Sequence, residues 1–225
     1  MTVSILNKDV KEGDIVEFGR YMQKNDNDMD NIEWNVLDVK DGKALLLSRY
    51  ALDFKQYNEK FGEYNWAQCS LRRWLNSDFL NAAFNDEEKK LIVLSTLVQN
   101  ETDNFEYAPK ENPDTQDYVF CLSQDEIVKY FSQDGQLYDF HAPVAATEYL
   151  LEKGKCYTNN DYLTDEGKPS VIWWTRSPSF DEYAAATICN YSNGYETDEI
   201  TTNFDQFPSV DWFIPVRPAL WISLS

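Results

Sequence analysis

Few residues of this chain have the types and spacings that catalysis requires. His141 is the only histidine, so a histidine-based catalytic dyad would have to use it, and a multi-histidine metal site is excluded by count. Its neighbours Phe140 and Ala142 are typical of a loop or packed turn, which favours a structural role. Cysteines occur at four distant positions, Cys69, Cys121, Cys156 and Cys189. They lack the C-x-x-C spacing of zinc and redox motifs, so free buried thiols are expected.

Carboxylates are abundant but show no catalytic pattern. With 39 acidic residues, adjacent pairs such as Glu87-Glu88 are expected by chance and are interpreted as solvated surface. No EF-hand loop and no phosphate-binding glycine motif is present, so no cofactor and no metal are predicted. The alternative function is a hydrolase or oxidase in which carboxylates, or Cys189 and a second thiol, converge in a concave site.

Two arginines stand inside otherwise apolar, strand-like runs, Arg176 and Arg217. A buried guanidinium must be paired or hydrogen-bonded, so we expect each to contact carboxylates or backbone carbonyls and to fix loops to the sheet. The tryptophans of the same runs, Trp173, Trp174 and Trp221, are expected to pack in the core or on a sheet face. The segment between the runs is rich in Tyr, Asn, Asp, Thr and Ser, which favours adaptable contacts over core packing.

The composition disfavours two classes of partner. At 225 residues with 43% hydrophobic side chains, the chain can form a core without disulfides, and a single domain over residues 1–225 is predicted. A net charge of −19 repels nucleic acid and anionic membranes. No signal-peptide pattern or membrane-spanning apolar window is present. The compartment is therefore unknown, cytoplasmic by default, with surface display if the chain is exported by other means.

Strands are predicted at both ends of the chain. Alternating apolar and polar residues predict strands over 14–19 and 32–39, and Asp41-Gly42 predicts a hairpin with 44–48 that forms one edge of the core sheet. Further strands are predicted over 118–122, 173–178, 184–189 and 216–222, with a turn at 193–194 and polar loops over 24–31, 100–117 and 156–168.

Helices are predicted in the middle of the chain, and capping patterns mark where they start. The patterns are Asn65 with Gln68, Asn85 with Glu88, and Ser123 with Glu126. Apolar residues at helical spacing predict two short helices after the first pattern, broken near Asn76. Helices are also predicted over 125–131 and 147–153. The order of strands, helices and strands predicts an α+β fold.

Six stretches of the chain resemble the domain of unknown function 6273 family. They are IEWNVLD (32–38), ALLLSRYALD (44–53), SLRRWLN (70–76), VFCLS (119–123), WWTRSP (173–178) and VRPALWI (216–222). That family resembles the C-type lectin-like and formylglycine-generating-enzyme-like folds and includes bacterial or phage variable proteins of diversity-generating retroelements. The resemblance implies a C-type lectin-like fold with short antiparallel sheets, a few helices and long loops, whose C-terminal segment displays ligand-contacting side chains.

A binding module, and not an enzyme, is the function that this resemblance implies. Its ligand is a protein or another macromolecule, contacted from residues 180–213. The predicted contact residues are Phe180, Tyr183, Tyr191, Asn193, Tyr195, Asp198, Asp205, Phe207 and Trp212. Tyr and Trp would supply rigid contact area, and Asn and Asp would supply hydrogen bonds.

The residues test three finer implications of the resemblance. Adenine-directed diversification of Asn codons yields many of the residue types found over 190–213, whereas Glu196, Glu199, Gln206 and Trp212 would have to be fixed positions. Iron-dependent relatives of the formylglycine-generating fold need several histidines, and copper-using members need a close cysteine pair, for which Cys189 has no neighbour in sequence. The calcium-binding signatures of true lectins are absent from the sequence.

Overall fold

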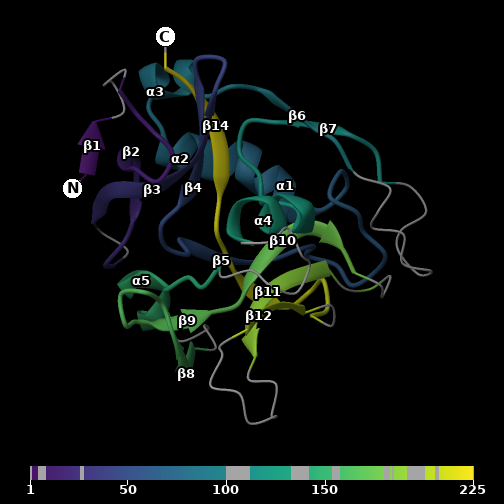
Figure 1. Cartoon of the computed structure of the whole chain (residues 1–225). Helices are drawn as coiled ribbons and strands as arrows, with labels where there is room; N and C mark the ends of the chain where they lie inside the picture. The colour runs from purple at the N-terminus through teal and green to yellow at the C-terminus, as the bar shows by residue number, and fades with distance from the viewer. Residues whose placement is uncertain are drawn as a thin grey trace.

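The computed structural model of the chain describes residues 2–4, 9–25, 28–99, 112–132, 142–153, 158–179, 183, 185–191, 201–205 and 208–224 (Figure 1). These residues form several short, mostly antiparallel sheets and a few short helices. The predicted α+β class is therefore confirmed.

A five-stranded sheet with the order β1-β2-β3-β4-β14 lies in the upper part of the molecule in Figure 1. Its strands are β1 (Thr2–Ser4), β2 (Ile15–Met22), β3 (Met29–Lys40), β4 (Lys43–Ser48) and β14 (Ala219–Ser223). Asp41 and Gly42 have φ angles of 51° and 69°, the conformation that a two-residue hairpin turn requires, so the predicted β3–β4 hairpin is confirmed. Its predicted place at the sheet edge is wrong, because β14 pairs antiparallel with β4 and covers it.

The helices follow the predicted capping boxes at two of three places. Both bonds of the box are present at Asn85 for α3 (Asp86–Leu91) and at Ser123 for α4 (Gln124–Phe131). Thr147 caps α5 (Glu148–Glu152). The first helix, α1 (Ser70–Trp74), has Cys69 and not Asn65 as its N-cap, because Asn65 instead caps the turn just before it.

The break predicted near Asn76 is a π-helix instead of an interruption. The segment η1 (Leu75–Phe79) joins α1 to α2 (Leu80–Ala83), and the backbone N–H of Leu80 donates to the carbonyl of Leu75 five residues earlier. The Asn76 side chain lies in this widened turn and donates to the Arg72 carbonyl at 3.0 Å. A polar residue that suggested a helix end is thus accommodated within a continuous helical segment.

A three-stranded sheet, β10-β11-β12, and three two-stranded pairs complete the fold. Its strands are β10 (Trp173–Pro178), β11 (Ala185–Tyr191) and β12 (Thr201–Asp205). The pairs are β13 (Phe213–Val216) with β5 (Asp53–Gln56), β6 (Ser95–Leu97) with β7 (Thr115–Asp117), and β8 (Thr158–Leu163) with β9 (Pro169–Val171). The strands predicted over 173–178 and 184–189 are confirmed, and the run predicted over 216–222 is split by Arg217-Pro218 into β13 and β14.

Three expectations about the second half of the chain are wrong, and the first is the predicted loop over 100–117, whose last three residues form strand β7. The predicted strand over 118–122 is irregular, with only an isolated bridge between Phe120 and Ala219. The side chains of residues 119–122 are buried in the core, so their hydrophobicity reflects burial and not strand pairing. The predicted polar loop over 156–168 contains strand β8, whose backbone pairs with β9 although its residues are polar. The turn predicted at 193–194 lies outside the described residues.

The core lies between the sheets and the helices and is rich in tryptophan. Trp34, Trp66, Trp173 and Trp174 are fully buried, and every residue of β10 is buried. Trp221 is partly buried against the core. The predicted packing role of Trp173, Trp174 and Trp221 is therefore confirmed. Among the described residues, no helix has the length and apolar character needed to cross a membrane.

Candidate functional site

The structure places the predicted contact residues unequally. Tyr183 and Trp212 are 38% and 58% exposed. Tyr191 ends strand β11 and Asp205 ends strand β12. The other predicted contact residues, and His141, lie outside the described residues: Phe180, Asn193, Tyr195, Asp198 and Phe207.

Four exposed aromatic side chains stand on segments whose backbones are hydrogen-bonded to one another. Tyr183 stacks on Phe61, with ring centroids 4.9 Å apart and planes 11° from parallel. Trp212 and Phe213 are adjacent in the chain and are 58% and 45% exposed. We call Phe61, Tyr183, Trp212 and Phe213 the aromatic surface. Exposed aromatic stacking is worth about 0.5–1.5 kcal/mol beyond burial, so the Phe61–Tyr183 pair is held in one orientation.

Backbone hydrogen bonds connect the segments that carry these four rings. The N–H of Val210 donates to the carbonyl of Tyr183 at 2.9 Å, and the N–H of Asn58 donates to the carbonyl of Val210 at 2.8 Å. Phe213 pairs with Gln56 across the β13–β5 ladder, and the Gln56 side chain donates to the carbonyl of Asp211 at 2.7 Å. The aromatic surface is thus built on a hydrogen-bonded frame that joins residues 53–61 to residues 183–213.

A polar pocket of about 590 Å³ adjoins the aromatic surface at Phe213. Strand β5 supplies Lys55 and Gln56 to its wall, and the helical segment α1–η1 supplies further polar groups, among them Ser77 and Asp78. Lys55 lies 4.7 Å from the centroid of the Trp74 ring, which also lines the pocket. The pocket therefore offers hydrogen-bonding groups of both charges beside exposed aromatic rings.

A buried carboxylate fixes the π-helix that forms one wall of the polar pocket. Asp117 is 1% exposed and accepts hydrogen bonds from four side chains: Trp66, Thr115, Arg72 and Asn76. The Asn76 side chain also accepts from the backbone N–H groups of Tyr118 and Val119. This network joins α1 and η1 to the chain after β7. π-Helical turns occur frequently at functional sites, so the polar pocket beside η1 is a candidate binding site.

The two arginines predicted to fix loops to the sheet make the expected kinds of contact. Arg176 forms an ion pair with Glu126 and donates to the carbonyl of Cys121 at 3.1 Å, which joins β10 to α4. Arg217 donates from Nε to the carbonyl of Ser48 at 2.9 Å, which joins the β13–β14 connection to β4. The prediction is confirmed for both residues.

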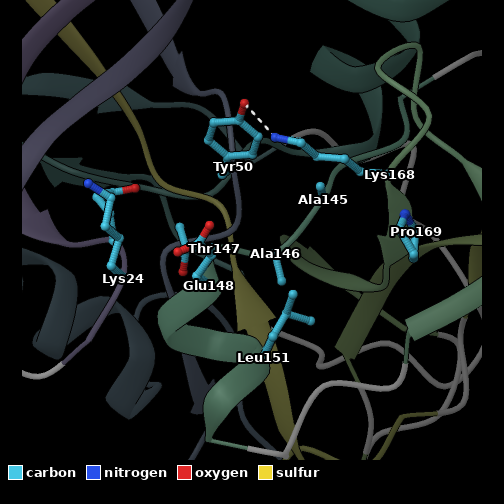
Figure 2. A pocket seen from close by; sticks show the side chains of 10 residues that line it. Lys24, Tyr50, Ala145, Ala146, Thr147, Glu148, Leu151, Lys168 and Pro169 are labelled. Carbon is cyan, nitrogen blue, oxygen red and sulfur yellow. Dashed lines mark hydrogen bonds between the residues drawn. The ribbon is translucent and has the colours of Figure 1, made fainter.

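A second cavity of about 380 Å³ lies beside α5 (Figure 2). Tyr50 and Lys168 meet at its rim, where Lys168 Nζ donates to the Tyr50 hydroxyl at 3.1 Å. Glu166 stands next to them and accepts hydrogen bonds from Arg49, Lys168 and Tyr50, and the Arg49 bonds are the main reason that its pKa falls to about 2. A carboxylate held ionised in this way is a structural anchor and not a general acid.

The thiols that the structure describes are not activated. Cys69 and Cys121 are free and buried, and burial raises the pKa of Cys69 to about 12 and the pKa of Cys121 well above its ordinary value. Because the thiolate is the nucleophile, these two cysteines are unreactive at neutral pH. The side chains of Cys156 and Cys189 lie outside the described part of the chain. Among the described residues, no three His, Cys, Asp or Glu side chains converge as a metal-binding group.

Phe61 and the residues of the polar pocket were not predicted from the sequence, and Phe213, although inside the predicted contact segment 180–213, was not named as a contact residue. Phe61 lies in a polar stretch, far in sequence from Tyr183, and a single exposed phenylalanine carries no signal of its own. Phe213 stands at the start of an apolar run and resembled the edge of the core. Aromatic residues recur at positions 54, 57, 61 and 64 with the spacing of a helix, but the chain forms strand β5 and an irregular stretch there, so this pattern gave no correct signal.

Comparison with known families gives one match. The model of the domain of unknown function family DUF6273 matches residues 41–224, so the chain belongs to this family. Comparison with curated proteins and with solved structures gave no match.

Proposed function

We propose that this DUF6273 protein is a binding module that holds a protein ligand against the aromatic surface and the adjoining polar pocket. The observation that supports the proposal most directly is the exposed, stacked Phe61–Tyr183 pair, with Trp212 and Phe213 exposed on segments that are hydrogen-bonded to it. Tryptophan and tyrosine are enriched among the residues that dominate binding energy at protein interfaces. Exposed aromatic rings that are not needed for the core lose water on binding and lose little conformational entropy.

The frame beneath the rings supports a binding role because it is already ordered. The bonds that join Val210 to Asn58 and to Tyr183 hold the rings in position without a ligand. Pre-organised contacts bind more tightly because less ordering is required on association. The polar pocket beside Phe213 would then accept a polar side chain or terminus of the ligand, with Lys55 and Asp78 offering opposite charges.

We further propose a C-type lectin-like arrangement and diversification of residues 180–213. In support, the C-terminal strand β14 belongs to the same sheet as the N-terminal strands. The strands on either side of the segment, β10 and β13, are buried in the core wholly and for the most part, respectively. A reverse-transcriptase gene beside the coding sequence, with a near-copy of the segment encoding Trp173 to Trp221, would support diversification. Its absence would remove that part of the proposal and leave the binding role intact.

Site-specific photo-crosslinking tests the binding role. A benzophenone amino acid is placed at Trp212 and, as a matched control, at Val98, which is equally exposed at 58% but follows β6. In cells of the source organism, we expect a protein adduct from position 212 that is absent from position 98. The adducted protein is identified by mass spectrometry and purified, and its affinity for the unmodified chain is measured.

Substitution of the aromatic surface completes the test. In the purified pair, Phe61→Ser and Trp212→Ser should each weaken binding at least about tenfold, as expected for residues that dominate an interface. Val98→Ser should leave the affinity unchanged. Equal adducts from positions 212 and 98, or affinities unaffected by Phe61→Ser and Trp212→Ser, would refute the proposed function.

A further inference from the structure

A third cavity of about 250 Å³ has a buried arginine in its wall. It is formed by the β2–β3 region, the residues after β4, the end of α4, residues 142–145 and the β8–β9 turn. One part of its wall is apolar and includes Ile15, Phe131 and Val144. Arg217, from the β13–β14 connection, completes the wall. None of these residues belongs to the aromatic surface or the polar pocket.

Arg217 has an unused hydrogen-bond donor in this position. It is only 3% exposed, and its Nε donates to the carbonyl of Ser48, but its Nη1 has no acceptor in the part of the chain that the structure describes. The guanidinium carbon lies 5.1 Å from the centroid of the Trp173 ring and 5.9 Å from that of Phe131. The Nε1–H of Trp173 also has no acceptor among the described residues. Two buried side chains, each with an unpartnered donor, are therefore packed against each other.

The charge of Arg217 also has no carboxylate partner among the described residues. Desolvation by burial lowers its pKa to about 9, so the side chain remains protonated at neutral pH. The other cation of the cavity wall, Arg49, is paired with Glu33 and Glu166. Arg176 gives a comparison within the same chain, because it is equally buried and has an unpartnered Nε but is paired with Glu126.

An unpaired buried charge costs free energy that an anion in the cavity would offset. Burying a guanidinium without a counter-charge is strongly unfavourable, because the charge loses its hydration and gains no ion pair in return. Glu166 and Asp165 also line the cavity, and their charges disfavour a ligand with two negative charges. Its volume, about eight times a water molecule's share of the liquid, suits a small molecule. The apolar residues on the same wall suit a ligand with a hydrocarbon part.

We propose that this cavity is a binding site for a small organic monocarboxylate, with the carboxylate accepting a hydrogen bond from the guanidinium of Arg217. The hydrocarbon part of the ligand packs against Ile15, Phe131 and Val144. Charge-assisted hydrogen bonds to arginine are about twice as strong as neutral ones, so the carboxylate and not its amide is the preferred ligand. The site is independent of the aromatic surface, and a failure of either proposal leaves the other standing.

NMR titration of the full chain with butyrate, and with butyramide as its uncharged analogue, tests this site. We expect butyrate to produce a saturable shift of the Arg217 Nε–H and Trp173 indole signals and no shift of the Arg176 Nε–H signal. Butyramide should bind at least about tenfold more weakly, the factor expected for loss of one charge-assisted bond. No saturable shift at Arg217, an equal shift at Arg176, or equal binding of butyramide would overturn the proposal.

Two variants separate loss of the site from loss of the fold. Val144→Phe fills the cavity while leaving Arg217 in place, and it should abolish butyrate binding. Arg217→Met removes the charge, and it should abolish binding in a chain whose remaining amide spectrum is unchanged. If Arg217→Met fails to fold, Val144→Phe alone decides. Butyrate binding that persists in a folded Val144→Phe chain would refute the proposed location.

Discussion

Replacing Asp117 with asparagine tests whether a buried carboxylate holds the π-helix beside the polar pocket. Both oxygens of Asp117 are occupied. Its Oδ2 accepts from Trp66 Nε1 at 3.0 Å and from Thr115 Oγ1 at 2.7 Å. Its Oδ1 accepts from Arg72 Nε at 2.6 Å and from Asn76 Nδ2 at 3.2 Å. Because all four contacts are donors, no donor group can replace either oxygen without losing a bond.

The cost of Asp117→Asn follows from this arrangement. An asparagine amide has one acceptor oxygen and one NH₂ donor. If the oxygen faces Arg72 and Asn76, the NH₂ group faces the buried N–H of Trp66, and leaving that donor unsatisfied costs about 1–3 kcal/mol. The bond from Arg72 also loses its charge assistance, roughly another 1–2 kcal/mol. We expect the free energy of unfolding to fall by about 3 kcal/mol, and Tm to fall by about 6–12 °C for a chain of this length.

Urea unfolding followed by tryptophan fluorescence measures the effect, with an unchanged slope m showing that the unfolded state is unaffected. The control is Glu87→Gln, which breaks the ion pair of Glu87 with Lys90, whose side chains are 82% and 68% exposed. An exposed pair contributes less than about 1 kcal/mol, so this variant should unfold almost as the parent does. A loss for Asp117→Asn no larger than that for Glu87→Gln would refute the reasoning.

Two further predictions concern the acid response and a close packing contact. Because the pKa of Glu166 is lowered from 4.5 to about 2, its ionised form stabilises the fold above pH 4.5, and this contribution is lost as pH falls toward 2. Glu166→Gln should therefore flatten the pH dependence of the free energy of unfolding between pH 4.5 and 2. The effect should be small because the side chain is 36% exposed. An unchanged pH dependence would contradict this prediction. Gly19→Ala should cost about 1–3 kcal/mol more than Gly13→Ala in urea unfolding. Both glycines have positive φ, but an added Cβ would lie 2.5 Å from the Phe84 ring at Gly19 and meets nothing within 4 Å at Gly13, so equal costs would show that Phe84 moves aside freely.

The parts of the fold that were predicted correctly depend on local chemistry. The Asp41-Gly42 turn is fixed by two residues that accept positive φ, and the capping boxes at Asn85 and Ser123 close within three residues. Strand β10 was predicted because its two tryptophans stand in a short apolar run, and the structure buries the whole strand. In each case the information lies within a few consecutive residues.

The parts that were missed depend on partners that are distant in sequence. The π-helix exists because Asn76 bonds residues 117–119, about forty positions away, and a local pattern shows only a polar residue that breaks an apolar stripe. Strand β8 is polar and is held by pairing with β9, without an apolar face to reveal it. The aromatic surface likewise requires Phe61 to meet Tyr183, which are separated by more than a hundred residues. Periodicity within one segment does not report such contacts.

Arg176 and Arg217 both meet the expectation drawn from the sequence, but they differ in the partner of their charge. Both stand in apolar runs, both are buried, and both bond a backbone carbonyl as expected. The capping glutamate of α4, Glu126, also neutralises Arg176, so a helix start and a buried charge share one carboxylate. No carboxylate among the described residues pairs with Arg217, and a cavity adjoins it instead. This difference between two otherwise similar arginines is the observation on which the proposed carboxylate site rests.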